Sequence, residues 1–208
     1  MELLVVAKEP VPGRVKTRLC PPCTHEEAAA LAEAALADTL EACCAVGVER
    51  VVVALDGRAG PWVPPGVDLV DQGSGAFDVR LARAWSQVRG PALQIGMDTP
   101  QVTPDLLRGA LDRLGLHGTD AVLGPAEDGG WWGLGLSQPD PQVVLGIPTS
   151  RADTGRRQLE RLVATGRRTG LLAVLRDVDR YRDALAVAVT IPGTRFGAMV
   201  AEMGRRVA

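Results

Sequence analysis

Four cationic residues, Lys8, Arg14, Lys16 and Arg18, lie close together near the start of the chain, with Glu9 as the single carboxylate among them. The formal net charge of the whole chain is −2, so this positive charge is a local property. Lysine and arginine side chains donate charge-assisted hydrogen bonds to phosphate oxygens. The cluster therefore favours a phosphate-binding loop, and the alternative is a solvated basic loop without a ligand.

The backbone of this loop is suited to a close approach by a ligand. Pro10 and Pro12 fix φ and remove two amide donors, while Gly13 carries no Cβ. The apolar run 3–6 precedes the loop and predicts a strand, and α/β folds place phosphate where a strand ends and a helix follows. The loop is not a Walker A motif, because Val15 stands where that motif requires a second glycine.

Two aspartates at strand ends are candidate metal ligands. Asp98 follows the apolar run 92–95, and Pro100 prevents the strand from continuing. Mg²⁺ retains several waters, so one or two carboxylates suffice to hold it between phosphates. Of Asp177 and Asp179, which follow the predicted strand 171–175, Asp179 is the candidate second ligand. The alternative role for Asp98 is a turn aspartate that accepts backbone hydrogen bonds.

A second turn has residue types that suit an acceptor molecule. Asp128 offers a carboxylate beside the amides of Gly129 and Gly130, which suits a hydroxyl-rich or phosphorylated ligand. Asp-Gly is also a strong hairpin signal, so a plain turn is the alternative. Trp131 is a candidate wall of the acceptor pocket, although it and Trp132 also suit the core.

Covalent catalysis is not indicated. His25 and His117 have no nucleophile motif near them, so catalysis by charge neutralisation and alignment is favoured. Cys20 and Cys23 have CxxC spacing, for which zinc and redox roles are the alternatives. We expect instead a surface-loop pair, with the adjacent cysteines at 43–44 in the core.

Strands alternate with capped helices along the chain. The predicted strands cover 3–7, 51–55, 67–70, 91–96, 120–123, 131–136, 171–175 and 186–191. The predicted helices cover 25–46, about 79–88, 104–114, 151–164 and a last one from residue 194. Most strands are continuous apolar runs, which is typical of a mostly parallel sheet with helices on both faces. The carboxyl ends of such strands form the ligand edge.

The 208 residues predict a single α/β domain over 1–208, with 186–208 as a C-terminal strand and helix extension. The small net charge argues against nucleic acid as a partner, and no apolar run is long enough to span a membrane. The N-terminus enters a strand without a basic leader, so we expect a cytoplasmic protein.

Six motifs, in order, resemble the bacterial family labelled domain of unknown function 2064, which has glycosyltransferase-A-like members. They are AKEPVPGRVKTRL (7–19), QGSGAFDVRLARAW (72–85), IGMDTPQVTPDLL (95–107), LGPAEDGGWWGLGL (123–136), GIPTS (146–150) and RDVDRYRDAL (176–185). The resemblance implies the nucleotide-diphosphosugar transferase (glycosyltransferase-A) fold and a distant relation to the molybdenum cofactor and phospholactate guanylyltransferases. It implies that the basic loop holds nucleotide, through Lys8, Gly13, Arg14, Lys16 and Arg18.

The resemblance also implies metal binding by Asp98 and Asp179. The sequence departs from the family pattern at Met97, where a smaller residue is usual, and at Arg180–Arg182, where Thr-Pro-Glu is usual.

The residues and the resemblance together predict a Mg²⁺-dependent (or Mn²⁺-dependent) nucleotidyltransferase. A small phosphorylated acceptor would attack a nucleoside triphosphate and release pyrophosphate, with Lys16, Arg18 and Asp98 as catalytic residues. One alternative is a glycosyltransferase that uses a nucleotide sugar, and a second is a non-catalytic nucleotide-binding protein. A second copy of the chain, forming a homodimer, is a candidate partner.

Overall fold

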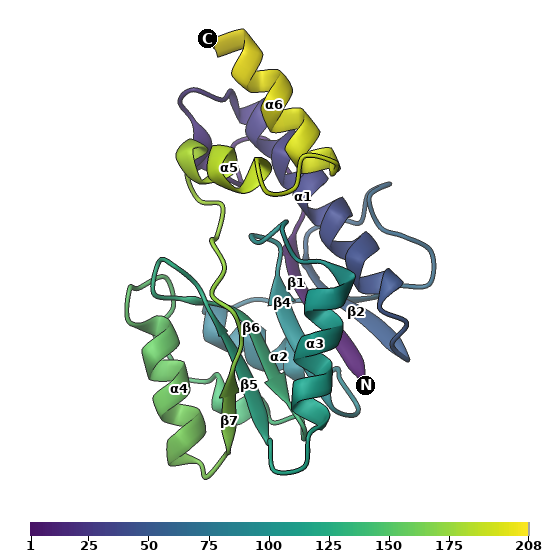
Figure 1. The fold of residues 1–208 in the computed structure, drawn as a ribbon, viewed down its shortest axis with the longest axis vertical. Helices are drawn as coiled ribbons and strands as arrows, with labels where there is room; N and C mark the ends of the chain where they lie inside the picture. The colour runs from purple at the N-terminus through teal and green to yellow at the C-terminus, as the bar shows by residue number, and fades with distance from the viewer. Residues whose placement is uncertain (208) are drawn as a thin grey trace.

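A seven-stranded sheet runs through the protein in the order β3-β2-β1-β4-β6-β5-β7 (Figure 1). The structure is a computed structural model that describes residues 1–207. The strands are β1 (Glu2–Lys8), β2 (Arg50–Asp56), β3 (Asp68–Asp71), β4 (Ala92–Gly96), β5 (Ala121–Pro125), β6 (Trp131–Leu136) and β7 (Thr169–Leu171). The mostly parallel sheet of a single α/β domain is confirmed.

Strand β6 is the exception, because it runs antiparallel to both β4 and β5. A short turn after β5 leads directly into β6, and a connection of this length joins only antiparallel neighbours. As a result, β6 begins at the edge where the parallel strands end, and Trp131 pairs with Pro125 there. The hairpin therefore brings its turn residues to the predicted ligand edge.

Helices cover both faces of the sheet (Figure 1). They are α1 (His25–Ala45), α2 (Phe77–Trp85), α3 (Pro104–Gly115), α4 (Thr154–Ala164), α5 (Tyr181–Ala188) and α6 (Arg195–Val207), with short 3-10 turns η1 (Thr17–Leu19) and η2 (Pro141–Val143). Because successive strand residues point to opposite faces, β1 divides its side chains between two cores. Leu3 packs in the core that contains α1 and α3, and Leu4 packs in the core that contains α2 and α4.

A third core joins the C-terminal helices to the first half of α1. Leu31 of α1 packs with Ala184 of α5 and Phe196 of α6, all three fully buried. Figure 1 shows α5 and α6 beside α1, away from the sheet. Val178, from the segment that leads from β7 to α5, is buried in the same cluster.

The predicted helix starts agree with the structure at two places. Thr24 and Glu27 form a reciprocal capping box at α1. Thr103 accepts a hydrogen bond from the amide of Leu106, and Pro104 is the first residue of α3. At α4, Asp153 is the N-cap residue, but its side chain forms no capping hydrogen bond.

Three sequence-based expectations about the C-terminal half and the cysteines are wrong. Residues 186–191 do not form a strand: α5 runs to Ala188, since Ala184, Val187 and Ala188 face the third core at helical spacing. The strand predicted at 171–175 is shorter and earlier, and Leu175 forms only an isolated bridge to Ala126.

The cysteine expectation also needs correction. Cys23 is buried rather than on the surface, and Cys44 is exposed rather than in the core. Burial, followed by the nearby Glu27, raises the pKa of Cys23 to about 11, so its thiol stays protonated near neutral pH. Within residues 1–207, no helix has both the length and the apolar character needed to cross a membrane.

Candidate active site

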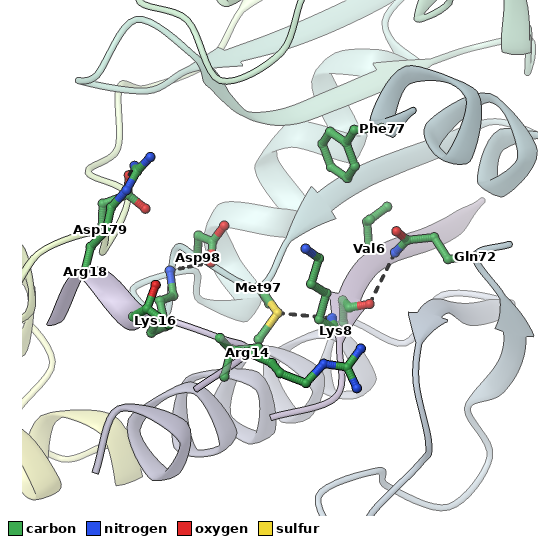
Figure 2. A pocket seen from close by; sticks show the side chains of 13 residues that line it. Val6, Lys8, Arg14, Lys16, Arg18, Gln72, Phe77, Met97, Asp98 and Asp179 are labelled. Carbon is green, nitrogen blue, oxygen red and sulfur yellow. Dashed lines mark hydrogen bonds and ion pairs between the residues drawn. The ribbon is translucent and has the colours of Figure 1, made fainter. Parts of the chain in front are cut away.

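A cavity of about 250 Å³ opens at the carboxyl ends of β1 and β4 (Figure 2). We call it the basic cavity; it is lined by Val6, Ala7, Lys8, Arg14, Val15, Lys16, Thr17, Arg18, Gln72, Phe77, Met97, Asp98 and Asp179. A larger cavity of about 500 Å³ adjoins it and shares Val6, Arg18, Phe77, Met97, Asp98 and Asp179 with it. The two cavities therefore form one continuous cleft, and the basic loop and the predicted metal ligands lie on its walls.

Lys16 is held tightly in this cleft. Its ammonium group donates to the carbonyl oxygen of Val178 at 2.5 Å and forms an ion pair with Asp98, and only 9% of its side chain is exposed. Its backbone is left-handed, with φ at 48°, which is uncommon for a residue with a Cβ. Surrounding contacts must hold such a conformation, and Lys16 Nζ supplies two of them.

Arg18 is paired with Asp179, at 2.9 Å between Nη1 and Oδ2. Their side chains are 68% and 45% exposed. An ion pair this open to water is weak, so a phosphate could replace the carboxylate at low cost.

Lys8 and Arg14 have no ion-pair partner in the described part of the chain. Both line the basic cavity, and in Figure 2 the Lys8 side chain reaches into the space between Asp98 and Val6. The Lys8 amide donates to the sulfur of Met97 at 3.2 Å, which fixes the end of β1 against the end of β4. These two cations are therefore the ones available to an incoming anion. Gly13 shapes the backbone of this loop with φ at 74° but does not line the cavity.

Four carboxylates face the larger cavity: Asp98, Asp128, Asp177 and Asp179. Asp177 and Asp179 flank the buried Val178 in an extended segment, so both point toward the cleft while Val178 points into the third core. Burial, followed by the neighbouring charges of Asp98 and Asp128, raises the pKa of Asp177 to about 7. The Oδ1 atom of Asp177 is buried without a hydrogen-bond partner.

This donor set fits a small divalent cation. Several carboxylates share one cavity, a buried carboxylate oxygen has no partner, and an ammonium group already contacts Asp98. Within residues 1–207, no three potential ligands converge on a common point. An ion here would thus be held by one or two carboxylates, with water and phosphate completing its shell, as is usual for Mg²⁺.

The Asp128 turn has a different role from the one predicted for its amides. The Gly129 amide donates to the carbonyl oxygen of Ala126 at 3.1 Å, and the Gly130 amide donates to Asp128 Oδ1 at 2.8 Å. Both donors serve the turn itself, so we do not retain them as donors to an acceptor. Gly129 has φ at 88°, and a Cβ there would lie 2.0 Å from the carbonyl oxygen of Ala152. Asp128 lines the larger cavity, and its Oδ2 atom accepts no hydrogen bond within the described residues.

The two adjacent tryptophans, Trp131 and Trp132, lie in different environments. Trp131 is half-buried and lines the larger cavity, whereas Trp132 is buried and donates from Nε1 to the carbonyl oxygen of Ala173 at 2.9 Å. Trp131 therefore lies on a cavity wall, and its role as a wall of the acceptor pocket stays a prediction.

The sequence-predicted site lacks two residues of the cleft that matter for the proposals below, Asp177 and Gln94. Asp177 lies beside the predicted ligand Asp179, and aspartates two apart in an extended segment share one side. Gln94, the polar residue in the run Ala92–Ile95, lines the larger cavity and is 2% exposed. A polar residue inside an apolar strand was the available signal.

The family profile described as "Uncharacterized protein conserved in bacteria (DUF2064)" matches residues 30–151. Among solved structures, one is a provisionally assigned nucleotide-diphospho-sugar transferase from Desulfovibrio desulfuricans G20. It is 24% identical and has a TM-score of 0.84, with 97% of this chain and 94% of that chain covered.

Two more distant structures share the fold. A nucleotidyl transferase from a Methanothermobacter species is 18% identical with a TM-score of 0.60, covering 90% of this chain and 95% of that one. Rv0371c from Mycobacterium tuberculosis H37Rv, in a complex with manganese, is 21% identical with a TM-score of 0.54, covering 89% and 97%. No protein of curated function matches the chain by sequence.

The chain therefore belongs to the DUF2064 family, and its fold is that of nucleotide-diphospho-sugar transferases and nucleotidyltransferases.

Proposed function

We propose that this DUF2064 protein is a metal-dependent nucleotidyltransferase. It joins a nucleoside triphosphate to a small phosphorylated acceptor and releases pyrophosphate. The observation that carries the proposal is that four cations and four carboxylates line one cleft, with the cations gathered in the basic cavity. Lys8, Arg14, Lys16 and Arg18 line the basic cavity, and four carboxylates line the adjoining one.

The basic cavity suits a triphosphate. Lys8 and Arg14 are unpaired there and attract the polyphosphate first. The exposed Arg18 can exchange Asp179 for a phosphate oxygen, since the ion pair is open to water. Lys16 remains fixed by the Val178 carbonyl oxygen and points its charge toward the region beside Asp98.

The carboxylates of the cleft suit a divalent ion, and Asp98 with Asp179 or Asp177 would hold it. A Mg²⁺ or Mn²⁺ ion bound there supplies neutralisation of charge on the bridging phosphate oxygens. Rv0371c, which shares the fold, is known in a complex with manganese, and this supports a divalent ion as the cofactor. The acceptor enters from the larger cavity, where Asp128 and Trp131 form part of the wall.

In the reaction, an acceptor phosphate oxygen attacks the α-phosphorus and forms a new P–O bond. The bond from the α-phosphorus to the bridging oxygen breaks, and pyrophosphate leaves with that electron pair. The protein supplies alignment and positive charge rather than a covalent nucleophile. A leaving pyrophosphate carries more charge than a nucleoside diphosphate leaving from a sugar, so four cations favour nucleotidyl transfer over glycosyl transfer.

The test is an assay of pyrophosphate release with ATP, GTP, CTP and UTP, each combined with Mg²⁺ and a panel of phosphorylated sugars and small phosphorylated acids. Phosphorus NMR follows the same samples to identify a product with a nucleotide joined to the acceptor. We expect pyrophosphate and that product in equal amounts with one triphosphate. The Asp98→Asn variant is the inactive control, and Asp105→Asn on the surface of α3 is the matched active control.

Three results separate the alternatives. Release of a nucleoside diphosphate from nucleotide sugars would indicate a glycosyltransferase instead. Triphosphate binding without turnover of any pair would indicate a non-catalytic nucleotide-binding protein. Absence of triphosphate binding would refute the proposal altogether.

A further inference from the structure

Gln94 is buried in the floor of the larger cavity and has no hydrogen-bond partner for its Oε1 atom. Only 2% of the residue is exposed. Its strand neighbours Leu4 and Leu134, which pair with it across β1 and β6, are apolar and belong to the core beneath α2 and α4. A primary amide in such surroundings is destabilising unless something hydrogen-bonds to it.

The space above Gln94 is open because of a glycine. Gly96 follows two positions along β4 and therefore lies on the same face of the sheet. A Cβ at Gly96 would meet only the amide nitrogen of Asp98, at 3.9 Å. Gly96 also lines the larger cavity, so a ligand that reaches past Asp98 finds the Gln94 amide at the end of its path.

The walls and the rim of this cavity have different characters. Val6 and Leu81 are buried apolar residues that form the inner wall of the larger cavity together with Gln94. Arg151, Arg180 and Asp128 also line this cavity and are exposed, so they form its rim. The rim therefore suits a phosphate and one hydroxyl, while the inner end offers a single uncharged group that both donates and accepts hydrogen bonds.

We infer that Gln94 determines acceptor specificity by hydrogen-bonding a hydroxyl group of a hydroxylated, phosphorylated acceptor. A hydroxyl is the natural complement of a primary amide, because it can donate to Oε1 and accept from Nε2. Charged groups are excluded from this position, since the inner wall has no counter-ion and burial of an unpaired charge is costly. This inference rests on the proposed function for the acceptor's role, but the binding preference it predicts is measurable without turnover.

The test compares Gln94→Met with wild type by calorimetric binding and thermal unfolding. Methionine has a similar shape and no amide. The probes are α-D-glucose 1-phosphate and sn-glycerol 3-phosphate, with methyl phosphate as the comparator that lacks a hydroxyl. We expect wild type to bind the hydroxylated probes more tightly than methyl phosphate. In Gln94→Met, the affinity for the hydroxylated probes relative to methyl phosphate should fall by roughly ten- to a hundredfold, because a buried hydroxyl is left unpaired.

Thermal unfolding gives an independent readout. Because the amide has no partner in the free protein, Gln94→Met should raise the melting temperature or leave it unchanged. The matched control is Gln158→Met, which removes an equally buried glutamine whose Nε2 donates to the carbonyl oxygen of Val143 at 2.9 Å. That control should unfold at a lower temperature and keep the wild-type preference among probes.

A second variant tests the path to the amide. Gly96→Ala places a methyl group in the open space and should weaken binding of the hydroxylated probes. Triphosphate binding should not change, because Gly96 and Gln94 do not line the basic cavity. A drop in melting temperature for Gln94→Met comparable to the Gln158 control would make Gln94 structural and overturn the inference. An unchanged probe preference in Gln94→Met, or a wild type that binds methyl phosphate as tightly as the others, would overturn it too.

Triphosphate binding in the same samples keeps the two proposals apart. Wild type that discriminates among the phosphate probes through Gln94 but binds no triphosphate supports this inference and refutes the proposed function. Wild type that binds triphosphate without discriminating among the probes supports the proposed function and refutes this inference.

Discussion

The ammonium group of Lys16 contacts the carboxylate of Asp98, so the cation expected to bind phosphate and the carboxylate expected to bind metal are paired in the free protein. Lys16 also donates to the Val178 carbonyl oxygen and is 9% exposed, whereas Asp98 is 48% exposed. When a metal ion and a triphosphate bind, Asp98 can therefore turn toward the solvent side while Lys16 stays fixed. Before these ligands bind, the ion pair holds the Lys16 ammonium group and the Asp98 carboxylate in the cleft and neutralises their charges.

Asp98→Asn should abolish turnover while the protein stays folded. The amide keeps the shape of the side chain but removes the charge that a divalent ion needs. Loss of one electrostatic element of this kind commonly costs about 10²–10³ in rate. Pyrophosphate release, Mg²⁺ affinity and melting temperature are measured together. Normal Mg²⁺-dependent turnover in this variant would end the metal hypothesis and leave Asp98 as a turn residue.

Lys16→Ala should weaken triphosphate binding by roughly ten- to a hundredfold, as expected for one charge-assisted contact. It should also lower the melting temperature, because Lys16 contacts both Val178 and Asp98.

Lys8→Ala should weaken triphosphate binding with no change in melting temperature, since Lys8 is unpaired. Arg108→Ala, on the surface of α3, serves as the control for loss of a cation. Calorimetry that finds wild-type affinity in folded Lys16→Ala would remove this residue from the site.

Mg²⁺ or Mn²⁺ should raise the melting temperature in the absence of nucleotide. A ligand that binds only the folded state stabilises it in proportion to the logarithm of its concentration above Kd. Asp179→Asn and Asp98→Asn should each reduce this shift, and Asp120→Asn, far from the cleft, should keep it. Titration at constant ionic strength separates specific binding from screening. Equal shifts in all four proteins would argue against a site at these carboxylates.

Asp120 should make stability depend on pH below about 4. Hydrogen bonds from Arg168 lower its pKa from the ordinary value of 3.8 to about 2. Because the folded pKa is depressed, its stabilising contribution is present above pH 3.8 and is lost as the pH falls toward 2. Asp120→Asn should therefore unfold at a lower temperature than wild type at pH 7, and the difference should shrink toward pH 2.

The matched control for this pair is Asp105→Asn, whose side chain is 95% exposed and whose partner Arg108 is on the same helix. The melting temperature of Asp105→Asn should match that of wild type at every pH from 7 down to about 2. If the difference in melting temperature between Asp120→Asn and wild type stays constant down to pH 2, the charge of the Asp120 carboxylate does not contribute to stability.

The sequence was sufficient to predict that the site residues lie at one edge of the sheet. Parallel strands end at the same edge, so Lys8 at the end of β1 and Asp98 after β4 were expected at one edge of the sheet. It could not reveal the pairing of Lys16 with Asp98, because that contact depends on how the loop folds back over β4. The strand prediction for 186–191 is wrong because Val187 and Val189 suit a strand locally, and only packing against α1 and α6 selects a helix.

Val178 links the cleft to the far end of the protein. Its side chain lies in the core with Phe196 of α6, its amide donates to the Asp98 carbonyl oxygen at 2.8 Å, and its own carbonyl oxygen accepts from Lys16. Shortening the chain before α6 would remove Phe196 and loosen the anchor of this segment. The same change would release the two aspartates beside Val178 from their alignment. A premature stop codon just ahead of α6 leaves every predicted ligand contact in the chain, yet it should act as an active-site mutation.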